Sequence, residues 1–144
     1  MADYTTVEAV QGLVPGFGTF SDTTKPTSTQ VEGYITDITA AIDGKIHRAG
    51  YTLPVADADA LTRLAYICAN GVIAVAFRGA RGRDPKEAEA FERVYQDGLA
   101  SIEAGDILGL VLDRASAGSL PHSRYTDSPT DYPTPSFQFG RRQW

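Results

Sequence analysis

The chain changes character near Leu112, and this change limits what its last part can fold into. Residues 113–144 contain four of the eight prolines and five of the fourteen aromatic residues. Each proline removes a backbone donor and holds its predecessor extended, so a helix and a central strand are both disfavoured there. Aromatic side chains are costly to leave in water. We therefore predict a body over residues 1–112 and an extended C-terminal arm over residues 113–144 that contacts a partner; the alternative is a disordered terminus.

The end of this arm carries residue types that dominate interface hot spots. In an extended segment, Phe137 and Phe139 lie on one face, and the main chain can pair with an exposed sheet edge of a partner. We expect aromatic and arginine residues of the arm to make the partner contacts, namely Tyr132, Phe137, Phe139, Arg141, Arg142 and Trp144.

Apolar residues of the body recur at helical spacing, which predicts an all-α fold, a small helical bundle with long loops. A short helix is expected at Tyr4–Gln11. The first long helix follows a loop, with Thr27 or Ser28 as its N-cap and Gln30 or Glu32 completing a capping box. Its apolar face consists of Val31, Ile35, Ile38, Ile42 and Ile46, and Gly50 supplies the left-handed stop.

Two further helices follow in the sequence. One begins near Ala56–Asp59 with acidic residues in its first turn, and its middle is apolar on all sides, so it should be central or face another subunit. The next has Asp84 as N-cap and Pro85 at its first position, and it ends at Gly105. The apolar run Ile107–Leu112 fits either a short strand or a last packed turn.

Charge is distributed unevenly between the two parts. Residues 1–112 carry 15 acidic and 9 basic residues, whereas residues 113–144 carry 3 and 4. A net-negative body argues against a dedicated nucleic-acid reader, because Lys and Arg supply most non-specific affinity for DNA. The longest apolar stretch, Ala65–Phe77, is too short to span a bilayer, and no signal-peptide pattern is present. We expect a soluble protein that uses no membrane.

Catalytic chemistry finds little support in the sequence. His47 and His122 lie on a helix end and in the arm, away from a nucleophile or a group of metal ligands. Cys68 sits in an apolar helix, where a thiol behaves as a small hydrophobic group. We therefore expect no enzyme, no catalytic residue, no metal site and no cofactor.

One basic cluster stands out at the end of the apolar helix. Arg78, Arg81 and Arg83 are separated by glycine and alanine. They are candidates for contact with DNA phosphates or with an acidic patch on a neighbouring subunit. The alternative interpretation is compensation of the helix dipole, followed by a flexible turn.

Several segments resemble the head-to-tail adaptor (connector) proteins of long-tailed bacteriophages. The resemblance covers Phe20 to about Leu112. It includes the residues Phe20–Thr27 ahead of Gln30-Val31, the helix end Ile42–Ile46, the turn at Gly50 with Pro54, and the segments Tyr95–Leu99 and Ile102–Gly105.

The resemblance implies a structural virion protein. Such adaptors are small helical proteins that form a ring, usually of twelve copies, which joins the portal vertex to the stopper or another tail-side neck protein. The ring leaves an axial channel through which genomic DNA passes without sequence-specific binding. The C-terminal arm would dock on the portal, and the location would be the neck of a virion assembled in the host cytoplasm. The alternative is a small cytosolic helical protein-binding module with a C-terminal linear motif.

Overall fold

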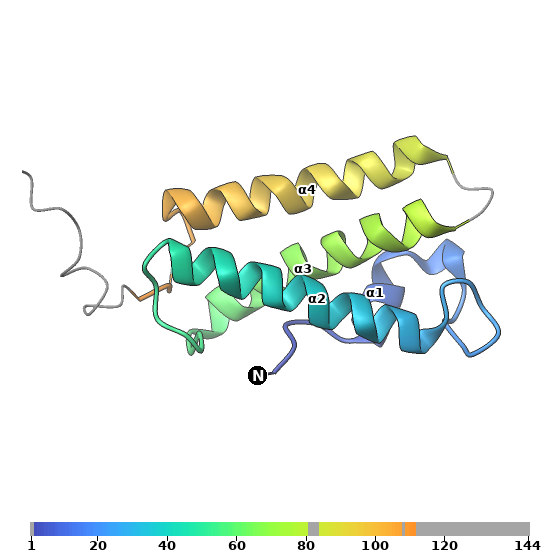
Figure 1. The fold of residues 1–144 in the computed structure, drawn as a ribbon, viewed down its shortest axis with the longest axis horizontal. Coiled ribbons are helices and arrows are strands. Elements are labelled where there is room, and N and C mark those ends of the chain that lie inside the picture. Colours follow the sequence, from blue (N-terminus) through green and yellow to red (C-terminus); the bar gives the residue numbers. More distant parts are fainter. Residues whose placement is uncertain (1, 81–83, 108, 112–144) are drawn as a thin grey trace, which may run out of the picture. The chain divides into compact units, whose positions relative to one another are not determined.

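The computed structural model describes residues 2–80, 84–107 and 109–111, and within them the chain forms four α-helices and one 3-10 turn (Figure 1). The helices are α1 (Val7–Leu13), α2 (Ser28–Arg48), α3 (Ala58–Gly79) and α4 (Pro85–Ala104), with η1 (Pro15–Phe17) after α1. The prediction of an all-α bundle with long loops is confirmed. The arm, residues 113–144, lies outside the described residues.

The N-terminus of α2 is fixed by a capping box. The Thr27 hydroxyl accepts a hydrogen bond from the backbone N–H of Gln30 at 3.2 Å, and the Gln30 side-chain oxygen accepts one from the backbone N–H of Thr27 at 3.1 Å. The sequence left Thr27 or Ser28 open as the cap and Gln30 or Glu32 as its partner, and the box forms between Thr27 and Gln30. At the other end, Gly50 has a φ of 83°, the left-handed conformation that ends a helix.

Aspartate side chains cap the N-termini of both α3 and α4. Asp84 accepts from the backbone N–H of Lys86 at 2.9 Å, and Gly105 closes α4 with a φ of 75°, both as predicted. Asp57 was expected in the first turn of α3. It is instead the N-cap, and its carboxylate accepts from the backbone N–H of Ala60 at 2.9 Å.

The predicted helix at Tyr4–Gln11 is wrong at both ends. Thr6 is extended, with φ −122° and ψ 164°, and its hydroxyl caps a helix that runs from Val7 through Gly12 to Leu13. Tyr4 therefore lies in an extended segment before α1, where its backbone N–H donates to Thr39 Oγ1 at 3.4 Å. A local cap has outweighed the weak helical pattern of the first residues.

Of the two forms that the sequence left open for the run after α4, the described residues 107 and 109–111 form no strand and agree with a last packed turn. Ile107 is buried at a bend, Gly109 lies in a turn, and Leu110 packs against the core. The backbone N–H of Thr52 donates to the carbonyl of Val111 at 2.7 Å, which ties this run to the loop after α2.

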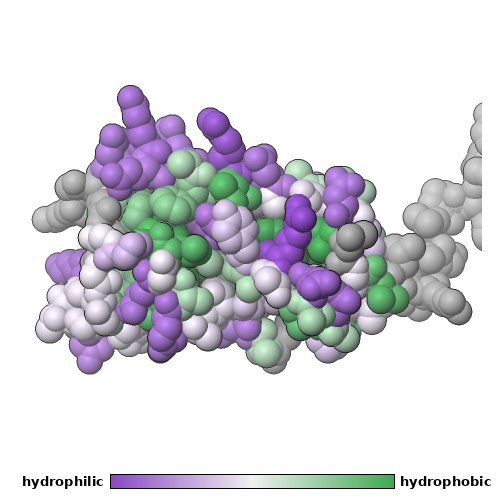
Figure 2. Space-filling view, turned by 180° about the vertical axis from the view of Figure 1, so that it is seen from behind, coloured by the Kyte–Doolittle hydropathy of each residue, from purple (hydrophilic) through white to green (hydrophobic). Residues whose placement is uncertain are grey.

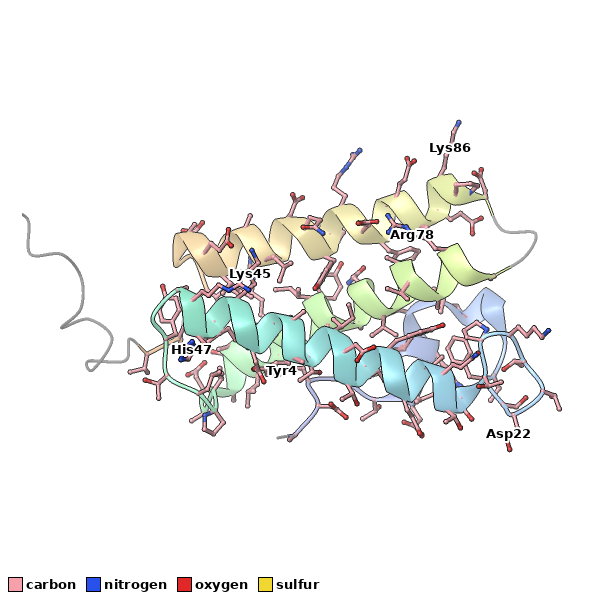
Figure 3. All side chains as sticks on the ribbon, viewed as in Figure 1. Tyr4, Asp22, Lys45, His47, Arg78 and Lys86 are labelled. Atoms are coloured by element: carbon pink, nitrogen blue, oxygen red, sulfur yellow. The ribbon has the colours of Figure 1, made fainter. Side chains whose placement is uncertain are left out.

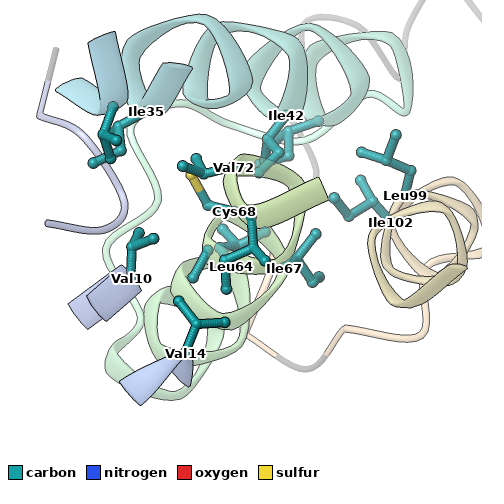
Figure 4. Packing of buried hydrophobic residues seen from close by; sticks show 14 of the residues in the cluster. Val10, Val14, Ile35, Ile42, Leu64, Ile67, Cys68, Val72, Leu99 and Ile102 are labelled. Carbon is teal, nitrogen blue, oxygen red and sulfur yellow. The ribbon is translucent and has the colours of Figure 1, made fainter. Parts of the chain in front are cut away.

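The core is built around α3, on which each of the other three helices packs (Figure 4). Apolar side chains from α1, α2 and α4 meet Leu64, Ile67 and Val72 of α3, and these three are no more than 3% exposed. This confirms the central position expected for α3. The helix is not covered on every side, however, since Leu61 and Val75 are each 37% exposed.

Small residues allow α3 and α4 to approach closely. A Cβ added at Gly98 would lie 2.6 Å from Cγ1 of Ile67, and one added at Gly71 would lie 2.8 Å from Cδ2 of Tyr95. Both distances are far below van der Waals contact, so side chains of each helix pack directly on the backbone of the other.

By length and composition alone, α3 is also apolar enough to cross a membrane. In the bundle, 67% of its most apolar window is buried inside the protein. Burial around most of the circumference is typical of the core helix of a helical bundle.

Candidate functional site

The residues predicted to bind a partner through the arm lie outside the described part of the chain. These are Tyr132, Phe137, Phe139, Arg141, Arg142 and Trp144. The same holds for Arg81, Arg83 and His122. Of the candidate residues, only Arg78, together with His47 and Cys68, can be placed in the body.

Arg78 lies in the last turn of α3 and forms an ion pair with Glu92 of α4 (Figure 3). The paired oxygen of Glu92 is buried and has no separate hydrogen-bond partner among the described residues. Loss of the guanidinium would therefore leave a partly buried carboxylate without its counter-charge. The Arg78 side chain, 61% exposed, thus has a structural task in joining two helices.

Cys68 and His47 show no arrangement for chemistry. Cys68 is fully buried, its Sγ lies 3.7 Å from Thr39 Oγ1, and burial raises the pKa of the thiol to about 11. A thiol that stays protonated at neutral pH is a poor nucleophile. His47 is exposed in the last turn of α2 beside Lys45 and Arg48. Among the described residues, no group of three His, Cys, Asp or Glu side chains could hold a metal ion.

A buried polar pair between the N-terminal segment and α2 was not predicted from the sequence. The Tyr4 hydroxyl donates to Oδ1 of Asp43, a residue that is only 6% exposed. Burial, and then the hydrogen bond to Asp43, raise the pKa of Tyr4. These residues are 39 positions apart, so no local pattern could have predicted their contact.

A groove of about 890 Å³ lies between the N-terminal segment and the first half of α2. Its charged lining residues are Asp3, Glu8 and Glu32, with no lysine or arginine among the residues that line it. Its other lining residues are Thr5, Thr6, Val7, Gln11, Thr19, Phe20, Ser28, Ile35 and Thr36. We call this feature the acidic groove.

The surface also presents apolar side chains. Figure 2 shows them gathered on the face opposite to that of Figure 1, below the polar side chains along the upper edge. Among the described residues, the large apolar side chains that are exposed are Leu13, Leu61, Tyr66, Val75 and Val111. Two smaller cavities, of about 330 and 540 Å³, flank the loop at Pro54 and include Leu61 and Val111 respectively.

Comparisons of the chain with protein-family models, with curated proteins and with solved structures found no match. The arguments below therefore depend on the residues of this chain and on their arrangement.

Proposed function

We propose that this protein is a head-to-tail adaptor of a bacteriophage virion. In this role, copies of the chain form a ring that joins the portal vertex to the stopper or tail, and the C-terminal arm docks on the portal. The ring leaves an axial channel for genomic DNA. The resemblance of Phe20–Leu112 to such adaptors motivates the proposal, and the surface charge of the helical body is the structural observation that carries it.

The charge of the body suits a wall along which DNA moves. The described residues include 15 acidic side chains but only seven lysines and arginines. Two of these seven, Lys45 and Arg78, are engaged in ion pairs with Glu103 and Glu92. Phosphates passing such a surface meet repulsion and few free cations, so the DNA does not stick.

The arm supplies attachment without a large rigid interface. An extended segment that orders on binding gains less affinity per contact, because it loses conformational entropy. In a ring, many arms bind at once, and each bound arm raises the effective concentration of the next. Weak single contacts by Phe137, Arg142 or Trp144 therefore add up to firm attachment.

The ring itself requires a head-to-tail contact between copies. Each copy would use two different surfaces, one for each neighbour, and the rotation between copies would close the ring. The exposed apolar residues Leu61, Tyr66 and Val75 of α3 are candidates for this contact. No catalytic step is part of the proposal.

Electron microscopy of purified DNA-filled heads that have a portal but no tail tests the proposal. We expect a ring to be added at the portal vertex by the full chain, and to be lost on deletion of residues 113–144. Absence of any added density at that vertex would refute the proposal and favour a cytosolic helical binding module with a linear motif.

A double variant separates docking from folding. Phe137→Ala with Trp144→Ala should weaken attachment to the portal while the melting temperature of the isolated protein stays nearly unchanged. A large loss of thermal stability would instead show that these aromatic residues belong to the body.

A further inference from the structure

The segment before α1 is fastened to α2 through a single residue. Tyr4 donates from its backbone N–H to Thr39 Oγ1 at 3.4 Å and from its hydroxyl to Asp43 Oδ1 (Figure 3). Within the described part of the chain, these are the two hydrogen bonds that join residues 2–5 to α2. Directly after this segment, Thr6 caps α1. We call residues 2–5 the strap.

The strap covers a row of polar groups. Thr39 and Asp43 are only 4% and 6% exposed. Cys68 of α3, labelled in Figure 4, is fully buried, and its Sγ lies 3.7 Å from Thr39 Oγ1. Burial raises the pKa of this thiol to about 11, and the negative charge of Asp3 also raises it, so the strap is an electrostatic neighbour of the thiol. The row thus runs from the strap through α2 to α3.

The strap also lines a cavity of about 330 Å³. Ala2, Asp3 and Tyr4 are its lining residues from the strap, and Asp43 lines it from α2. The other lining residues are apolar, namely Leu53, Pro54, Val55 and Leu61. Removal of the strap would therefore turn this cavity into an open groove, in which a carboxylate adjoins apolar side chains.

Exposing this row costs less than detaching a helix from the core. A polar group that loses its partner inside a folded protein regains hydrogen bonds to water once it is exposed. Thr39 and Asp43 are such groups, so lifting the strap restores their hydration. Exposing Val10 or Val31 would instead lose hydrophobic stabilisation without any return. Segments held by few apolar contacts open locally while the rest of a protein stays folded.

We propose that the strap opens and closes while the four helices stay folded, and that opening uncovers Thr39, Asp43 and Cys68 together with the cavity. Thr6 is the pivot, because its backbone is extended, with φ −122° and ψ 164°, and its hydroxyl caps α1 independently of the strap. The open form presents a groove that the closed form covers. This change goes beyond the proposed function, since it needs neither a second copy nor a portal.

Reaction of Cys68 with dithionitrobenzoate measures the opening, because this residue is the only cysteine of the chain. A thiol must reach water and ionise before it reacts. In low urea, the reaction rate of the full chain should depend only weakly on the urea concentration, because opening of the strap exposes little surface. A rate with the full urea dependence of global unfolding at all concentrations would overturn the proposal.

A pair of tyrosine variants identifies the strap as the barrier. Tyr4→Phe leaves Asp43 without its donor in the closed form only, so the reaction in low urea should be at least about tenfold faster. Tyr34→Phe is the matched control, because Tyr34 is a partly buried residue of α2 that does not belong to the row, and it should leave the rate nearly unchanged. Equal rates for the two variants would contradict a barrier formed by the strap.

A core variant separates opening of the strap from destabilisation of the body. Ile102 of α4 is fully buried and lies on the other side of α3 from α1 (Figure 4). Ile102→Val should lower the melting temperature but leave the rate of the Cys68 reaction in low urea unchanged, since the contacts of the strap remain. An acceleration that matches its loss of global stability would show that the thiol is reached by unfolding of the body, which refutes the proposal.

A double variant tests the role of the polar row. Tyr4→Phe with Asp43→Leu leaves no carboxylate to regain water, and leucine has the same branched shape as aspartate. Lifting the strap then exposes an apolar side chain, so the double variant should react more slowly than Tyr4→Phe alone. A reaction as fast as that of the single variant would contradict an opening that depends on hydration of Asp43.

Discussion

The close approach of α3 and α4 at Gly98 can be tested by adding a single methyl group. In Gly98→Ala, the new Cβ would lie 2.6 Å from Cγ1, 2.8 Å from Cδ1 and 2.8 Å from Cγ2 of Ile67. Ile67 cannot turn aside easily, because a β-branched side chain in a helix has one strongly preferred rotamer. The helices must therefore move apart or accept strain.

Two opposing effects set the magnitude. Overpacking of a core costs about 1–3 kcal/mol, while alanine is favoured over glycine within a helix by about 1 kcal/mol. Gly98→Ala should thus lower the free energy of unfolding by as much as about 2 kcal/mol. Gly33→Ala in α2 is the matched control, because its Cβ meets no atom within 4 Å and only the gain in helix propensity remains.

Urea unfolding of both variants measures the difference directly. We expect Gly33→Ala to be more stable than Gly98→Ala by about 1–3 kcal/mol, which corresponds to a difference in melting temperature of at least about 4 °C for a body of this size. Equal stabilisation by the two alanines would refute direct packing of Ile67 on the backbone of α4.

Three further predictions concern the caps, the buried thiol and the N-terminal segment. Thr27→Ala should destabilise the protein by about 1 kcal/mol through loss of the capping box, whereas Thr29→Ala on the exposed surface of α2 should change stability by less than about 0.5 kcal/mol in the same thermal melts. Because burial raises the pKa of Cys68 to about 11, the folded state keeps a proton that the unfolded chain loses near pH about 8.5. The free energy of unfolding should therefore fall as the pH rises from about 9 to 11, and Cys68→Ala should make that fall smaller in urea titrations. Tyr4→Phe leaves the buried Asp43 without its donor and should cost about 1–3 kcal/mol, well above the cost of Tyr34→Phe, as chemical denaturation would show.

Features fixed by neighbouring residues could be predicted from the sequence. The box at Thr27 and Gln30, the cap at Asp84 and the left-handed Gly50 and Gly105 all depend on residues within a few positions of one another. Such contacts are decided by local backbone chemistry, and the helix boundaries follow from them.

Features that join distant residues could not be predicted in this way. The Tyr4–Asp43 hydrogen bond and the ion pair of Arg78 with Glu92 arise only when the helices pack. The acidic groove is a similar case, since Asp3 and Glu32 become neighbours through the path of the chain before α1. The exposure of Leu61 also depends on which surface of α3 its neighbours leave uncovered.

The central position of α3 has a consequence for how the body opens. Because α1, α2 and α4 all pack on this one helix, detaching any of them exposes apolar surface that the others cannot cover. Detaching α4 or α2 exposes most of this surface, so the amide protons of α3 should be the last to exchange with solvent.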